Sequence, residues 1–235
     1  MKLPFNTVIL TYPRSGTHML QSTLSKHPDI YISNEIFHPR FSSAEIVGGG
    51  LNSVLNHWFA KAPDKKVRIA VIHLTHAKPD DVMTQGTDCY KIWNMLYNDT
   101  GIKVIMLRRA SYLRRYVSHR IAGLNDVFNI YDKRDRPNAK IHIDPLAYFE
   151  NIMRTDQLYR DTLAGFQDHR LKLWWYEKMV DNFGLTMNEI CDFLEVSRMA
   201  AQPETILKET RSMKDVIENY DEVMDFFKGH PYATY

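Results

Sequence analysis

The sequence predicts an α/β protein with a central parallel sheet and helices on both faces of that sheet. Short apolar runs rich in β-branched residues, the pattern of strands buried on both faces, occupy residues 7–12, 67–74, 89–93, 102–107 and 171–176. Segments with helical periodicity lie between these runs, at residues 18–26, 44–60, 111–122, 145–166 and 186–194. Strands that alternate with helices form βαβ units, which place helices on both faces of a parallel sheet.

Turn and capping residues define the ends of several predicted elements. The string PRSGT at residues 13–17 interrupts the first strand, and Pro28 ends the helix that follows. Residues 29–33 are then expected to be extended and to return to the sheet. The string TMNE at residues 186–189 has the capping-box pattern, so we expect the helix over 186–194 to begin there.

Composition limits the classes of function that the chain can have. Its 235 residues are 44% hydrophobic, enough for one packed core, so we expect a single domain over residues 1–235. A formal net charge of +2 is too small to indicate a nucleic-acid-binding surface. Cys89 and Cys191 lie far apart without zinc-ligand spacing, so reduced thiols are expected. No apolar run could cross a bilayer and no signal-peptide pattern precedes the first strand, which predicts a cytoplasmic protein.

The segment YPRSGTHM at residues 12–19 carries the strongest functional signal. It connects a predicted buried strand to a predicted helix, and such a turn directs backbone N–H groups at an anion. Gly16 allows a close approach of the backbone, and Arg14 adds a planar cation. Ser15, Thr17 and His18 add side-chain donors. The pattern therefore predicts a phosphate-binding loop.

This loop does not match the Walker A pattern GxxxxGK[ST], so a nucleoside triphosphatase is disfavoured and no metal is expected. Instead, YPRSGTHML resembles the 5′-phosphosulfate-binding loop of the sulfotransferases that use 3′-phosphoadenosine-5′-phosphosulfate (PAPS). The arginine form is similar to the loop of tyrosylprotein sulfotransferases and of several bacterial relatives. The resemblance implies a P-loop-like nucleotide-binding fold, PAPS as cosubstrate and PAP as product. It also implies a binding loop made of Arg14, Ser15, Gly16, Thr17, His18 and Met19.

The similarity continues through HPDIYISNE at residues 27–35, where the family has a glutamate that serves as general base. Glu35 occupies that place. Its competitors are His73 and His76 in the string VIHLTH, which resembles the KTHLP segment of sulfotransferases with a histidine base. We favour Glu35 and keep His73 as the alternative.

The segment at residues 102–122 resembles the family's 3′-phosphate motif, in which an arginine ends a strand and a serine follows on a helix. A 3′-phosphate needs a fixed cation and a hydroxyl donor. Ser118 supplies the hydroxyl, and either Arg108 or Arg109 supplies the cation. Arg109 precedes Ser118 by nine residues (118 − 109), one more than is usual in the family. The choice between the two arginines therefore stays open.

Four further residues follow from weaker similarities. Tyr176, in LWWYEKM, matches a family tyrosine that packs near the adenine. Lys208 and Arg211 match a basic C-terminal loop that covers the 3′-phosphate. Lys91, in CYKIW, is a charge within a predicted buried strand, where it needs an anion or loses its proton. It resembles a family lysine beside the transferred group, and we predict a catalytic role for it.

Two other functions remain possible from the sequence. One is a kinase-like P-loop enzyme that uses ATP and Mg²⁺, and the other is a noncatalytic module that binds PAP. The acceptor is not specified and could be a carbohydrate, a lipid head group, a phenol or a peptide tyrosine. The irregular stretch at residues 123–144, with a mixed charge run at 132–136, fits either a solvated loop or a lid over the acceptor. Oligomeric state is not predicted.

Overall fold

The computed structural model describes residues 2–125, 139–203 and 211–232. Its centre is a five-stranded sheet in which all neighbouring strands are parallel, in the order β2-β3-β1-β4-β5. The strands are β1 (Thr7–Thr11), β2 (Ile30–Glu35), β3 (Val67–His73), β4 (Lys103–Arg108) and β5 (Leu171–Trp175). Every residue of β1 is buried, as expected for the central strand of a sheet that is covered on both faces. The predicted fold class is confirmed.

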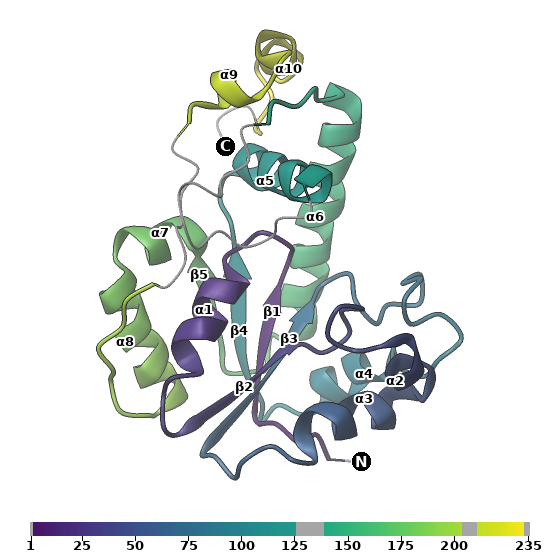
Figure 1. The fold of residues 1–235 in the computed structure, drawn as a ribbon, viewed down its shortest axis with the longest axis vertical. Helices are drawn as coiled ribbons and strands as arrows, with labels where there is room; N and C mark the ends of the chain where they lie inside the picture. Colours follow the sequence, from purple (N-terminus) through teal and green to yellow (C-terminus); the bar gives the residue numbers. More distant parts are fainter. Residues whose placement is uncertain (1, 126–138, 204–210, 233–235) are drawn as a thin grey trace.

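Helices cover both faces of this sheet (Figure 1). On one face, a cluster around Met19, Leu20 and Ile190 is formed with α1 (Thr17–Leu24), α7 (Tyr176–Asp181) and α8 (Phe183–Leu194). The cluster on the opposite face involves α2 (Ala44–Gly48), α3 (Gly50–Phe59), α4 (Lys91–Asn98) and α6 (Pro145–Gly165). A third cluster joins α5 (Tyr112–Asn125) to α6, α9 (Met213–Val216) and α10 (Tyr220–Phe226). In Figure 1 this third cluster lies beyond the carboxyl ends of the strands.

Several predicted elements were wrong or displaced. The strand predicted at residues 89–93 is wrong, because Lys91 begins α4, where Ile92, Trp93 and Leu96 form a buried face at helical spacing. A short apolar run does not distinguish a buried strand from a buried helix turn. The predicted capping box is also wrong: α8 begins at Phe183, and Thr186 lies buried inside it. The helix predicted at residues 44–60 is two helices that divide at Gly49 and Gly50.

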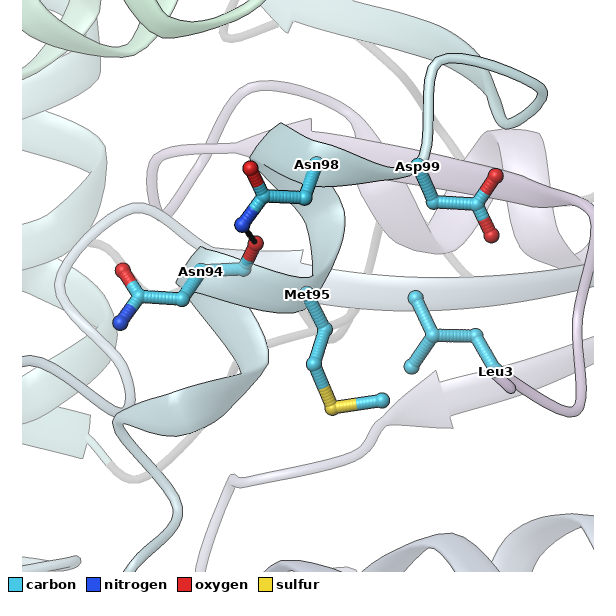
Figure 2. A pocket seen from close by; sticks show the side chains of 5 residues that line it. All are labelled: Leu3, Asn94, Met95, Asn98 and Asp99. Atoms are coloured by element: carbon cyan, nitrogen blue, oxygen red, sulfur yellow. Dashed lines mark hydrogen bonds between the residues drawn. The ribbon is translucent and has the colours of Figure 1, made fainter. Parts of the chain in front are cut away.

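A pocket of about 330 Å³ lies near the amino-terminal edge of the sheet (Figure 2). Its lining consists of Leu3, Asn94, Met95, Asn98 and Asp99. The amide of Asn98 donates a hydrogen bond to the carbonyl of Asn94, at 2.7 Å. The one charged lining residue is an aspartate, and the pocket is at the opposite end of the strands from the predicted phosphate loop. It is therefore unsuited to an anionic nucleotide.

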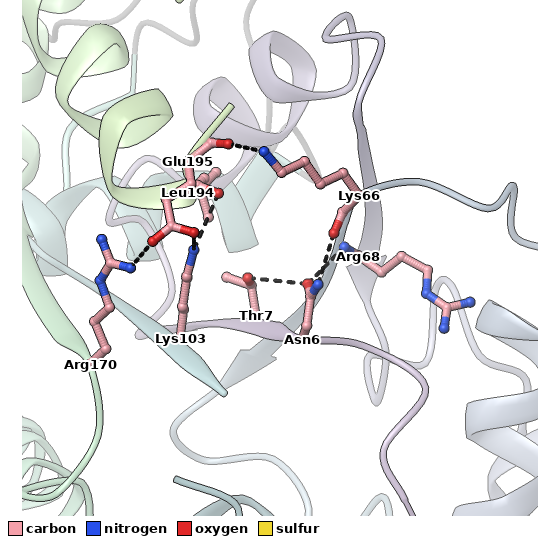
Figure 3. A network of polar contacts seen from close by, with 8 residues as sticks. All are labelled: Asn6, Thr7, Lys66, Arg68, Lys103, Arg170, Leu194 and Glu195. Atoms are coloured by element: carbon pink, nitrogen blue, oxygen red, sulfur yellow. Dashed lines mark hydrogen bonds and ion pairs between the residues drawn. The ribbon is translucent and has the colours of Figure 1, made fainter. Parts of the chain in front are cut away.

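A polar network joins several elements at this same edge (Figure 3). The side chain of Asn6 donates to the carbonyl of Lys66 at 2.9 Å and accepts from the backbone N–H of Arg68 at 3.0 Å. Glu195, after α8, forms ion pairs with Arg170 and with Lys103, the latter at 3.2 Å. These contacts connect the starts of β1, β3, β4 and β5 to the end of α8, so we assign this network to the scaffold.

Candidate functional site

The carboxyl ends of all five strands contribute to one row of residues. In sheet order, these are Glu35 at the end of β2, His73 at the end of β3, the loop at residues 12–16 after β1, Arg109 after β4 and Tyr176 after β5. Ligands of parallel α/β sheets bind at this edge, where connections on either side of a strand run to opposite faces. The row places the predicted base on the β2–β3 side and the predicted phosphate ligands on the β1–β4–β5 side.

The phosphate loop has an unusual backbone. Arg14 and Gly16 both adopt left-handed conformations, with φ of +69° and +91°. Gly16 is also the residue before the first turn of α1, where no side chain caps the helix. The N–H groups of that first turn therefore lack a capping side chain, which suits a helix start that receives an anion. The side chains of Ser15, in the loop, and Met19, in the first turn of α1, are buried, so we expect these residues to contribute through their backbone N–H groups.

Tyr176 packs directly against Gly16. A Cβ atom built on Gly16 would lie 2.5 Å from Cδ2 of Tyr176, well inside van der Waals contact. The tyrosine is 7% exposed, and its ring lies 4.6 Å from the guanidinium of Arg109. Tyr176 therefore connects the loop after β1 with the arginine after β4, and its place at the nucleotide site stays a prediction.

The structure brings Arg14, Arg109 and Ser118 together. Nε of Arg14 donates to Oγ of Ser118 at 3.0 Å, across 104 residues of sequence. Nη1 of Arg109 donates to the backbone carbonyl of Arg14 at 3.2 Å. Burial lowers the pKa of both arginines, and the charge of Arg109 lowers the pKa of Arg14 further. A half-buried and a buried cation this close together favour a bound anion, which would relieve both effects.

The two candidate arginines of the 3′-phosphate motif have different environments. Arg108 donates to Asp156 at 2.6 Å and also to the hydroxyl of Tyr112. Burial opposes the charge of Arg108, but the contacts with Tyr112 and Asp156 outweigh burial and raise its pKa. Arg108 is thus held by its own ion pair, whereas Arg109 is the arginine beside the phosphate loop. The geometry favours Arg109 as the ligand.

Glu177 is a site residue that the sequence reasoning missed. Its carboxylate accepts hydrogen bonds from the backbone N–H groups of Ala110 at 2.9 Å and Ser111 at 3.2 Å. It also lies 3.8 Å from Nε of Arg109. Glu177 therefore fixes the turn that leads into α5 and helps to hold Arg109 in place. Its position directly after Tyr176, at a strand end, was the available signal.

Glu35 and His73 meet at the other side of the loop. Oε1 of Glu35 lies 2.9 Å from Nε2 of His73, and the two side chains are 18% and 6% exposed. Burial alone would raise the pKa of Glu35, but the contact with His73 and the neighbouring His38 lower it below its usual value. The charge of Glu35 in turn partly opposes the lowering of the pKa of Arg14. The carboxylate of Glu35 therefore lies within electrostatic reach of the loop.

Two further histidines complete this side of the site. The ring of His76 lies 4.8 Å from that of His73 and 5.9 Å from that of His38. Burial, together with the charge of His73, lowers the pKa of His76 to about 3, so this histidine is neutral near pH 7. Burial also lowers the pKa of His38. A base with a pKa near 3 gains little from accepting a proton at neutral pH, which weakens the case for His76 as the base.

Lys91 does not lie in the buried strand that motivated its catalytic role. It begins α4, its side chain is 55% exposed, and it pairs with Asp88 at 3.2 Å. A solvated lysine with its own carboxylate needs no further anion, so the argument for its role fails. Arg211 is directed at the carbonyl of Ala139 at 3.5 Å. Lys208 and the charge run at 132–136 lie outside the described residues.

Metal-binding clusters and membrane-spanning helices are both absent from the described part of the chain. Within residues 2–125, 139–203 and 211–232, no cluster of three or more histidine, cysteine, aspartate or glutamate side chains could hold a metal ion. In the same part of the chain, no helix has the length and apolar character needed to traverse a bilayer.

Two curated relatives and a solved structure are similar to the chain over most of its length. No family model matches the sequence. The chain is 23% identical to nodulation protein H of Rhizobium tropici, over 97% of this chain and 91% of the relative. It is 24% identical to nodulation protein H of Rhizobium meliloti (strain 1021), over 97% and 93%.

Among solved structures, a sulfotransferase from Alicyclobacillus acidocaldarius matches with a TM-score of 0.56 and 17% identity, over 95% of this chain and 91% of that one. The chain therefore has the sulfotransferase fold. The resemblance predicted from the phosphate loop is confirmed at the level of the fold.

We predict that Gly16→Ala destabilises the protein more than Gly86→Ala. Gly86 has a similar φ of +78° but nothing within 4 Å of its added Cβ, so it is a matched control. Gly86→Ala should cost only the left-handed strain, about 1 kcal/mol. Gly16→Ala should cost roughly 2–4 kcal/mol, because Tyr176 must also move. Urea unfolding of both variants measures the difference. Equal losses would mean that Gly16 and Tyr176 are not in close contact.

Proposed function

We propose that the protein transfers the sulfuryl group of PAPS to a hydroxyl or amine of an acceptor. The observation that carries this proposal is the pair of cations, the half-buried Arg14 and the buried Arg109, beside a loop with left-handed residues at the carboxyl edge of the sheet. Such an arrangement fits a ligand with two separate phosphate groups. The fold and the nodulation protein H relatives support the same class of enzyme.

Residues at different places along the row would bind different parts of PAPS. The loop backbone and Arg14 would hold the 5′-phosphate, and Arg14 would stabilise the charge that develops there as the sulfuryl group leaves. Arg109 would hold the 3′-phosphate, with Tyr176 against the adenosine. Ser118 would share its hydroxyl between Arg14 and the 3′-phosphate, since it already accepts from Arg14. PAPS supplies the sulfuryl group, and its transfer leaves PAP.

Glu35 is the proposed general base. Its lowered pKa keeps it as a carboxylate at neutral pH, ready to accept the proton of the acceptor. Activity that depends on this carboxylate should fall as the pH falls through the pKa of Glu35. Within the proposal, the acceptor remains one of the four classes named from the sequence. A cytoplasmic location and a single domain over residues 1–235 stay predictions.

We predict that PAP raises the melting temperature of the protein, and that ATP with Mg²⁺ does not. A ligand that binds only the folded state stabilises it, by about 2.7 kcal/mol at a hundredfold excess over its Kd. Differential scanning fluorimetry with PAP, adenosine 5′-phosphate, ATP–Mg²⁺ and buffer separates the two donor classes. Stabilisation by ATP–Mg²⁺ alone would favour the kinase-like alternative.

We predict that Arg109→Ala weakens PAP much more than adenosine 5′-phosphate, because only PAP carries the 3′-phosphate. Loss of one charge-assisted contact should lower the PAP affinity on the order of 10- to 100-fold. Arg108→Ala is the matched control: it removes one partner of Asp156, so it should lower stability but leave the ratio of the two affinities unchanged. Calorimetric titration of both ligands measures the ratio. The opposite pattern would assign the 3′-phosphate to Arg108.

We predict that Glu35→Gln lowers single-turnover transfer at least ~10²-fold while PAP affinity changes little. Glutamine keeps the shape and the hydrogen bonding of glutamate but cannot take the proton. Radiolabelled PAPS with an acceptor found by screening the four classes provides the assay, and His76→Ala is measured beside it. A normal rate in Glu35→Gln with a dead His76→Ala would transfer the role of base to His76. Intact PAP binding without turnover by the wild type for any acceptor would favour a noncatalytic module.

A further inference from the structure

Glu35 is placed by an irregularity in β2. The register between β2 and β3 shifts between Ile32 and Glu35, as at a β-bulge. Two hydrogen bonds hold the shifted segment: the backbone N–H of Val71 donates to Oγ of Ser33 at 3.2 Å, and the amide of Gln21 donates to the carbonyl of Ser33 at 2.9 Å. Bulges re-aim the side chain that follows them. Here that side chain is Glu35, which meets His73 of the neighbouring strand.

The contact fixes the roles of the atoms in the pair. Nε2 of His73 lies 2.9 Å from Oε1 of Glu35. When Glu35 is ionised, the hydrogen shared by this pair belongs to the histidine, because a carboxylate has no proton to give. Nε2 of His73 is then engaged by Glu35, so within the proposal the second carboxylate oxygen of Glu35 accepts the proton. The histidine that competed with Glu35 in the sequence is its partner.

We propose that His73 is the positioning residue of the general base and holds the carboxylate of Glu35 in place. This inference rests on the proposed function. In the reaction, the acceptor oxygen forms its bond to sulfur while the bond from sulfur to the bridging oxygen breaks. The acceptor proton moves to Glu35, and the negative charge leaves on the 5′-phosphate beside Arg14. His73 stays bound to Oε1 throughout.

The titratable and charged groups that face Glu35 come from the end of β3 and from the connections after β1, β2 and β3. His73 and His76 lie at and after the end of β3, His38 follows β2, and Arg14 lies in the loop after β1. His76, with a pKa of about 3, adds no charge near neutral pH. Burial favours the protonated form of Glu35 and so raises its pKa, whereas the contact with His73 lowers that pKa. Without His73, burial is less opposed and the pKa of Glu35 should rise.

The test compares His73→Gln and His73→Ala with His57→Ala, a change of an exposed histidine on α3. The amide nitrogen of glutamine can replace Nε2 as a donor to Glu35. The pKa of Glu35 is read by NMR of carboxyl-labelled glutamate, with Glu35→Gln to assign the signal. We expect His73→Ala to raise the pKa of Glu35 by at least about one unit. His73→Gln should raise this pKa less, and His57→Ala should leave it unchanged. This measurement requires neither PAP nor an acceptor.

The pH dependence of kcat/KM gives the second readout. The acidic limb of the profile should move to higher pH with the pKa of Glu35, and His73→Gln should recover activity above that limb. The inference is overturned if the pKa of Glu35 is the same in all three histidine variants. It is also overturned if both His73 variants are inactive at every pH with PAP binding intact, because His73 would then be the base. Failure of the wild type to bind PAP would instead reject the proposed function, while the NMR titration would still decide the pairing.

Discussion

The parallel pairing of β1 with both β3 and β4 is the constraint on which the rest of the site depends. All strands of the sheet run in the same direction, so their carboxyl ends reach one edge, and every connection starts there. Residues that are far apart in sequence thereby become neighbours, as the contact between Arg14 and Ser118 illustrates. The opposite edge carries the network of Asn6 and Glu195, whose hydrogen bonds and ion pairs hold the strand starts together.

Positive charge concentrated behind and beside the phosphate loop gives the site its chemical preference. Besides Arg14 and Arg109, Arg115 is only 2% exposed. It donates to the neutral side chains of Asn151 at 2.6 Å and Thr155 at 3.2 Å, and its guanidinium lies 4.5 Å from the ring of Tyr12. Burial lowers its pKa, as it does for the other two arginines. Burying such charges costs free energy, which a multiply charged anion bound at the loop would offset.

Local sequence was enough to predict features that depend on few residues. The glycine and the arginine of the loop follow from one short string, and β1, β3, β4 and β5 follow from apolar runs. The strand predicted around Lys91 was wrong because the run is only five residues long. So short a run does not show whether buried positions recur every two residues, as in a strand, or every 3.6, as in a helix. The pairing of Glu35 with His73 could not be predicted, because it depends on a bulge between β2 and β3 that no residue pattern marks. The choice of Arg109 over Arg108 likewise needed the position of Asp156, on a distant helix. Glu35 as base and the ligand roles of Arg109 and Ser118 stay predictions.

The order of the strands also indicates the side of the site from which the acceptor would approach. With Glu35 on the β2–β3 side and Arg109 on the β4 side, the phosphate loop after β1 lies between the base and the 3′-phosphate ligand. An acceptor whose proton goes to Glu35 must then approach over the connections that follow β2 and β3. Those connections carry large exposed apolar side chains, at Phe41, Val82, Met83 and Tyr90. The phosphate side is built from buried groups that one cosubstrate would need. Selectivity for the acceptor should therefore depend on the connections after β2 and β3, where side chains can change without disturbing the loop, Tyr176 or Arg109.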